Sequence, residues 1–127
     1  MKRVLLIVAA LGFVNAPVGA YAQCRGTDRA VTKQLRFARG RTTAVVRDRV
    51  RLCTSHEFVL RARGGQTMSV HLATGRKTSF TLQSPSGTVE GADGVKDWSG
   101  ELPESGDYVI IIGTDATAAY TLEVTIR

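Results

Sequence analysis

The chain has 127 residues, and its 17 lysine and arginine residues outnumber its 11 aspartate and glutamate residues, giving a formal net charge of +6 at pH 7. This length leaves room for one domain and excludes a multidomain architecture. The longest apolar run, residues 4–14, is too short to cross a membrane as a helix, which needs about 20 residues. We therefore expect no stable membrane insertion.

The first 22 residues have the pattern of an export signal. Lys2 and Arg3 form a positively charged start, the apolar run follows, and Ala20-Tyr21-Ala22 supplies the small-x-small pattern that signal peptidase cleaves. A lipid anchor on Cys24 is disfavoured because Gln23 stands where a lipobox needs a small residue. The sequence predicts a signal peptide over residues 1–22, one domain over residues 23–127, and a periplasmic or secreted product.

Two cysteines, Cys24 and Cys53, lie in the expected mature part. An even pair in an exported chain indicates one disulfide. The alternative, a catalytic or metal-binding pair, has no support because there is no C-x-x-C motif and the two histidines, His56 and His71, lack ligand spacing. We expect neither a cofactor nor a metal.

Charge is unevenly distributed along the mature chain. Residues 23–89 contain 13 basic and 3 acidic residues, whereas residues 90–127 contain 8 acidic and 2 basic ones. The sequence thus predicts two halves of opposite charge, of which the acidic one could attract a basic partner.

Strand periodicity begins after residue 23 and continues to the end of the chain. Apolar side chains alternate with polar ones in four segments, with Phe58-Leu60-Ala62, Met68-Val70-Leu72, Phe80-Leu82 and Tyr120-Leu122-Val124-Ile126 on the apolar side. Glycine-, serine- and proline-rich turns separate these segments, and residues 109–112 are apolar on both faces, as in a central strand. We predict an all-β fold, a single antiparallel β-sandwich of seven to eight strands.

Three motifs carry a resemblance to known proteins. They are Gly64-Gly65-Gln66-Thr67-Met68-Ser69-Val70, residues 98–110 with the sequence WSGELPESGDYVI, and Tyr120-Thr121-Leu122-Glu123-Val124. Together they resemble the bacterial pre-peptidase C-terminal domain, a β-sandwich module, and the periplasmic inhibitor of g-type lysozyme with its i-type relative. The likeness spans residues 35–126, nearly the whole mature domain.

The resemblance to the inhibitors implies a functional loop. In that family an S-G-x-Y loop enters the lysozyme cleft, and here the matching residues are Ser105, Gly106, Asp107 and Tyr108. It implies that Ser105 and Tyr108 contact the lysozyme and that Gly106 forms the turn. The alternative for Tyr108 is a structural corner tyrosine whose hydroxyl binds the backbone. The alternative for Ser105 is a serine that suits the turn through local hydrogen bonding.

Other features leave room for a second class of function. Arg47, Arg49 and Arg51 alternate along one predicted strand, which indicates either a solvated sheet face or a patch for an anionic glycan. The chain has no nucleic-acid recognition motif, and His56-Glu57 lacks the second histidine of a zinc protease motif. We expect a lysozyme inhibitor that is not an enzyme; the alternative is a glycan- or surface-binding module.

Overall fold

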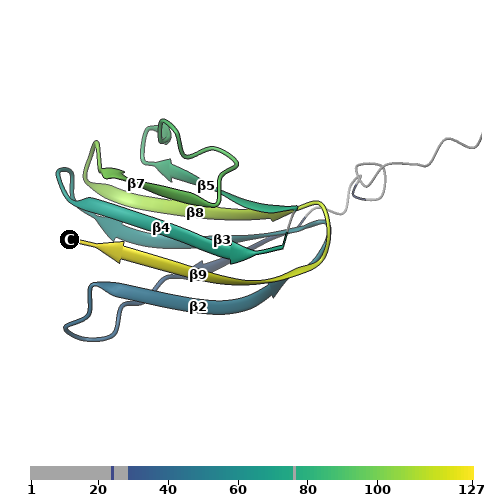
Figure 1. Ribbon diagram of the computed structural model, residues 1–127. Helices are drawn as coiled ribbons and strands as arrows, with labels where there is room; N and C mark the ends of the chain where they lie inside the picture. The colour runs from purple at the N-terminus through teal and green to yellow at the C-terminus, as the bar shows by residue number, and fades with distance from the viewer. Residues whose placement is uncertain (1–23, 25–28, 76) are drawn as a thin grey trace, which may run out of the picture.

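The computed structural model describes Cys24 and residues 29–75 and 77–127 (Figure 1). These residues form nine strands: β1 (Arg29–Gln34), β2 (Thr43–Val50), β3 (Thr54–Ala62), β4 (Thr67–Thr74), β5 (Thr78–Ser84), β6 (Gly87–Thr88), β7 (Asp97–Glu101), β8 (Gly106–Thr114) and β9 (Ala118–Ile126). The expected signal peptide, residues 1–22, and its cleavage site lie outside the described residues. No helix in the described part of the chain is long and apolar enough to cross a membrane.

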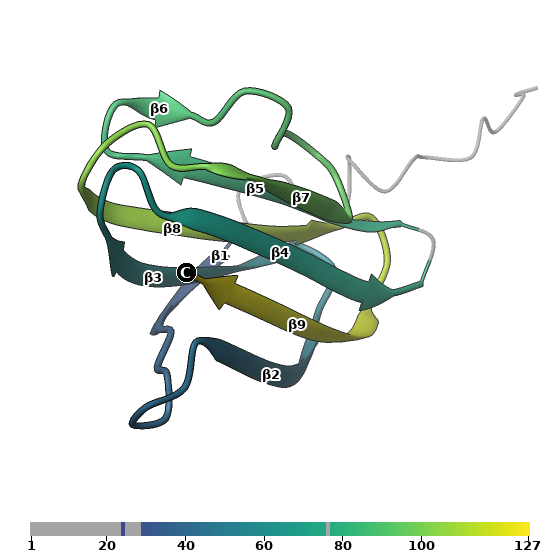
Figure 2. The same cartoon turned by 60° about the vertical axis from the view of Figure 1, so that its left-hand side comes forward.

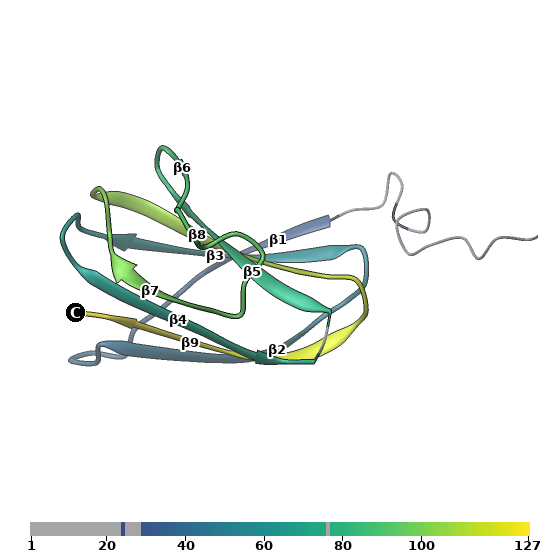
Figure 3. The same ribbon diagram turned by 45° about the horizontal axis from the view of Figure 1, so that its top comes forward.

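The strands form two sheets packed face to face, which Figure 3 shows as two layers. One sheet has the order β1-β3-β8-β5-β6 and the other the order β2-β9-β4-β7. The predicted all-β sandwich is confirmed. It has more strands than the seven or eight expected because β6 has only two residues and β1 pairs in parallel with β3, an arrangement that alternation alone does not reveal.

Alternating side chains fill the space between the sheets. On β4, the side chains of Met68, Val70 and Leu72 are buried, while those of Ser69 and His71 are exposed. Strands β3, β5, β8 and β9 follow the same period, so both sheets present an apolar face to one core. As predicted for a central strand, β8 pairs with β3 on one side and with β5 on the other.

Trp98 covers one open edge of this core. Figure 2 shows β6 and β7 at this edge of the sandwich and β2 toward the opposite one. The indole ring of Trp98 packs against the buried cluster, and its Nε1–H donates a hydrogen bond to the carbonyl of Glu90 at 3.3 Å. A Cβ added at Gly100 would lie 2.7 Å from the ring, so this glycine makes room for the indole. Trp98 therefore has the packing role expected of a half-buried aromatic residue.

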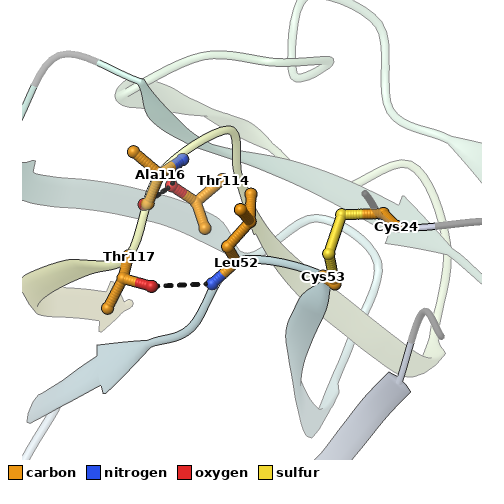
Figure 4. Close-up of a disulfide and its surroundings, with 6 residues drawn as sticks. All are labelled: Cys24, Leu52, Cys53, Thr114, Ala116 and Thr117. Atoms are coloured by element: carbon orange, nitrogen blue, oxygen red, sulfur yellow. Dashed lines mark hydrogen bonds between the residues drawn. A yellow bond between two sulfur atoms is a disulfide. The ribbon is translucent and has the colours of Figure 1, made fainter. Parts of the chain in front are cut away.

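A disulfide links Cys24 to Cys53 in the turn between β2 and β3 (Figure 4). The backbone N–H of the adjacent residue, Leu52, donates a hydrogen bond to Thr117 Oγ1 at 3.0 Å, which ties this turn to the β8–β9 turn. The bridge predicted from the two cysteines is confirmed. It holds Cys24 against the β2–β3 turn at one end of the sandwich.

Reduction of this disulfide should lower stability without abolishing the fold. The bridge joins residues separated by 29 positions, and a loop of that size contributes roughly 3–4 kcal/mol by restricting the unfolded chain. We expect the melting temperature to fall by roughly 10 °C or more while the β-type circular dichroism spectrum persists at room temperature. An unchanged melting temperature after verified reduction would contradict this account.

A buried histidine lies between the two sheets near strands β1 and β2. His56 Nδ1 lies 2.6 Å from the hydroxyl of Tyr120 and 3.8 Å from Asp48 Oδ2. Lys33 Nζ is 2.5 Å from the same carboxylate oxygen. Burial lowers the pKa of His56 and raises that of Tyr120, and the hydrogen bond from Lys33 lowers the pKa of Asp48. His56 therefore serves as a neutral hydrogen-bonding residue that joins β3 to β9.

This histidine makes stability depend on pH. Because its pKa is lower in the folded than in the unfolded chain, acid favours the unfolded state as pH falls below about 6.5, the value for a free histidine. We expect the melting temperature to drop from neutral pH toward pH 5 in wild type. His56→Gln should be less stable at neutral pH but should lose this part of the pH dependence. His71→Gln, which changes the exposed histidine, should keep it; a flat profile in wild type would contradict the assignment.

Candidate functional site

The predicted S-G-x-Y motif lies at the end of the sandwich opposite the disulfide. Its first three residues belong to the β7–β8 loop, defined here as residues 102–107, which includes the first two residues of β8, and Tyr108 follows in that strand. In Figure 1 this loop lies at the left of the molecule, near the β3–β4 turn and the C-terminus. Backbone hydrogen bonds Gly65 N–Leu102 O (2.9 Å) and Leu102 N–Gln66 O (2.8 Å) join the loop to the β3–β4 turn.

Tyr108 anchors the loop from beneath. Its side chain is 0% exposed and lies in the core. Its hydroxyl donates a 2.6 Å hydrogen bond to the carbonyl of Glu104 and accepts one of 3.2 Å from the N–H of the same residue. For the side chain of Tyr108 to contact a partner, the ring would have to leave the core. The structure instead gives it the corner role that was the alternative.

The side chain of Glu104 fastens the loop to the β5–β6 turn. Its Oε1 accepts hydrogen bonds from the hydroxyl of Ser84 at 2.9 Å, from the backbone N–H of Ser86 at 3.0 Å, and from the hydroxyl of Ser86. The hydrogen bonds from Ser86 and Ser84 lower the pKa of Glu104, so the carboxylate stays ionised at neutral pH. Both ends of this residue, backbone and carboxylate, are therefore held in place.

Gly106 fits a position that admits no side chain. Its φ angle is +144°, and an added Cβ would approach the Pro85 ring to 2.7 Å. Gly64, in the β3–β4 turn, also packs closely against the loop: a Cβ added at Gly64 would lie 3.2 Å from the backbone of Glu104. The turn-forming role expected of Gly106 thus has a steric reason in addition to its backbone conformation.

Ser105 lies at the exposed surface of this supported loop. Its Oγ accepts a hydrogen bond from the backbone N–H of Gly64 at 2.9 Å. Because that bond uses a lone pair, the hydroxyl hydrogen is free to donate to another molecule. Asp107 is also exposed, so Ser105 and Asp107 are the members of the predicted motif whose side chains can reach a partner.

A shallow hollow of about 560 Å³ borders the loop. Its walls come from the end of β3, from the β3–β4 turn and from the loop itself: Arg61, Ala62, Arg63, Gln66, Ser105 and Gly106. Arg61 stands opposite Asp107 in the β3–β8 register. At this point the fold therefore places a basic residue from the first half of the chain beside an acidic residue from the second half.

The other predicted sites lie elsewhere. Arg47 and Arg49 are exposed on β2, at the edge of the second sheet, and Arg51 is exposed just beyond that strand. They do not line the hollow beside the loop. Within residues 24, 29–75 and 77–127, no three histidine, cysteine, aspartate or glutamate side chains are grouped to hold a metal ion.

Sequence reasoning missed the residues that support the loop. Ser84 and Pro85 lie in one of the serine- and proline-rich turns, and Arg61 and Arg63 lie at the end of the alternating segment that contains Phe58, Leu60 and Ala62. Nothing in a single sequence placed them beside residue 105, which is distant along the chain. The pairing of β3 and β5 with β8 brings them together.

Comparisons with known proteins first define the type of fold. No family model and no curated protein matches the sequence. Among solved structures, the pre-peptidase C-terminal domain of collagenase from Bacillus anthracis matches with a TM-score of 0.50 and 8% identity, over 79% of this chain and 96% of that one. At this identity the match concerns the fold, and it confirms the predicted pre-peptidase C-terminal domain-like sandwich.

Periplasmic inhibitors of g-type lysozyme are more similar. PliG from Aeromonas hydrophila matches with a TM-score of 0.69 and 26% identity, covering 79% of this chain and 99% of that one. PliG from Salmonella Typhimurium matches with a TM-score of 0.59 and 20% identity, over 76% and 97% of the two chains. The resemblance predicted from the three sequence motifs is confirmed.

Replacing Tyr108 tests how the loop is held. Tyr108→Phe removes both hydrogen bonds to Glu104, so we expect a loss of about 1–2 kcal/mol in the free energy of unfolding and faster amide hydrogen exchange over residues 104–106. Tyr120→Phe makes the same chemical change away from the loop and should leave exchange there unchanged. Equal amide exchange over residues 104–106 in wild type and Tyr108→Phe would contradict the anchoring role.

Proposed function

We propose that this protein is an inhibitor of g-type lysozyme that acts in the periplasm, after removal of a signal peptide over residues 1–22 from a domain of residues 23–127. The observation that carries the proposal is the match to the Aeromonas hydrophila inhibitor, which extends over 99% of that chain at 26% identity. The similar inhibitors are described as periplasmic, in agreement with the export signal expected from the sequence. They are inhibitors and not enzymes, as expected here.

The β7–β8 loop is the part of the surface that we propose enters the lysozyme cleft. Glycosidases cleave their substrate with a carboxylic acid that protonates the glycosidic oxygen. A loop that presents a hydroxyl donor at this acid can occupy the place of the sugar. Ser105 supplies that hydroxyl, Gly106 allows the backbone to turn, and Asp107 lies beside them on the exposed side.

Rigidity supports this use of the loop. Glu104 is held through its backbone by Tyr108 and through its carboxylate by Ser84 and Ser86. A loop already ordered before binding loses less conformational entropy in the complex, which favours affinity. Tyr108 thus contributes indirectly, by positioning the loop rather than by touching the enzyme.

Replacing Ser105 tests the proposed contact. Ser105→Ala removes the hydroxyl that would bind a charged group in the cleft, so we expect a roughly tenfold to hundredfold loss of affinity for g-type lysozyme. The melting temperature should change little because the bond to Gly64 is exposed. Ser99→Ala, an exposed serine on β7, serves as the matched control and should inhibit as wild type does.

Lysis of a cell-wall suspension by g-type and i-type lysozymes provides the measurement. If wild type in micromolar excess protects against neither enzyme, the inhibitor proposal is wrong. The protein would then be a glycan- or surface-binding module, for which Arg47, Arg49 and Arg51 are the proposed contacts with an anionic glycan.

A further inference from the structure

The hollow beside the β7–β8 loop gathers hydrogen-bond donors that the fold does not use. Arg61 and Arg63 are exposed and lie two residues apart, at the end of β3. Among the residues that the structure describes, neither guanidinium group forms an ion pair or a hydrogen bond. Arginine presents a planar set of donors that fits the two oxygens of a carboxylate.

Two neutral donors face the same space. The hydroxyl of Ser105 accepts from Gly64 and keeps its hydrogen free, and the Oε1 atom of Gln66 accepts from the backbone N–H of Arg63. Because Oε1 is occupied, the amide NH₂ of Gln66 is left as a donor. Both side chains line the hollow together with the two arginines. Asp107 stands opposite Arg61 in the β3–β8 register but does not line the hollow. The residues that do line it offer more donors than acceptors, which suits an anion.

We infer that Arg61 and Arg63 form a binding site for a carboxylate of the partner enzyme. This inference rests on the proposed function and deepens it, because it assigns the carboxylate as the catalytic acid of the lysozyme. The hollow is continuous with Ser105 and Gly106, so an acid that accepts a hydrogen bond from Ser105 lies within reach of an adjacent guanidinium group. The arginines bind the ionised form of that acid and prevent it from protonating the substrate.

The inference predicts a definite dependence on pH. Catalytic acids of glycosidases can have pKa values raised to about 6, so that they carry a proton at neutral pH. Arginine favours the ionised form, so binding releases this proton and the affinity rises as pH increases through the pKa of the acid. Removing the two guanidinium groups removes most of this increase.

A double-mutant cycle tests the pairing by binding rather than by activity. The probes are g-type lysozyme and its variant with the catalytic acid replaced by the corresponding amide, titrated calorimetrically with the full-length mature inhibitor. We expect the double variant Arg61→Gln, Arg63→Gln to bind wild-type lysozyme at least about tenfold more weakly. It should bind the amide variant with almost the affinity of the unaltered inhibitor.

The control is the double variant Arg47→Gln, Arg49→Gln, which changes net charge equally but on the other sheet. It should leave both affinities unchanged. The carboxylate site would be overturned if Arg61→Gln, Arg63→Gln lost the same affinity for both lysozymes, or if the two double arginine variants lost the same affinity for wild-type lysozyme. In either case, binding of lysozyme by the wild-type inhibitor would still uphold the proposed function. Failure of wild type to bind any lysozyme would overturn both.

Discussion

The hydroxyl of Tyr108 makes the contact on which the geometry of the candidate functional loop depends. It binds both the carbonyl and the N–H of Glu104, so one buried side chain fixes the backbone of an otherwise exposed loop. The ring cannot shift without disturbing the core between the two sheets. Stability of the sandwich and geometry of the loop are therefore coupled through this residue, and a change that loosens the core around β8 also loosens the loop.

The remaining supports of the loop come from neighbouring turns. Glu104 is bound by the β5–β6 turn, Gly106 fits against Pro85, and Ser105 accepts from the β3–β4 turn. None of these contacts closes the surface above Ser105, which stays exposed. A supported loop with a free hydrogen-bond donor at its surface suits insertion into a cleft. The loop is already ordered in the folded protein, so it loses little further conformational entropy when it binds.

The fold could be predicted well from the sequence because the features that identify it are contained in short segments of the chain. Alternation in segments such as Met68-Val70-Leu72 identifies strands, and two cysteines in an exported chain identify a disulfide. The parallel pairing of β1 escaped prediction because it depends on where a strand docks and not on its period. For the candidate site, the motif identified Ser105 and Gly106 as a prediction. The places of Arg61, Pro85 and Ser86 beside them follow from strand order, which periodicity does not determine.

The central claim is that the β7–β8 loop occupies the substrate cleft of a g-type lysozyme. It is tested most directly by calorimetric titration of the lysozyme with this protein in increasing concentrations of a peptidoglycan fragment that fills the cleft. If the loop and the sugar share one site, the apparent dissociation constant will rise in proportion to the fragment concentration. A complex of unchanged affinity at saturating fragment would show that the two bind at separate places, and would contradict the account.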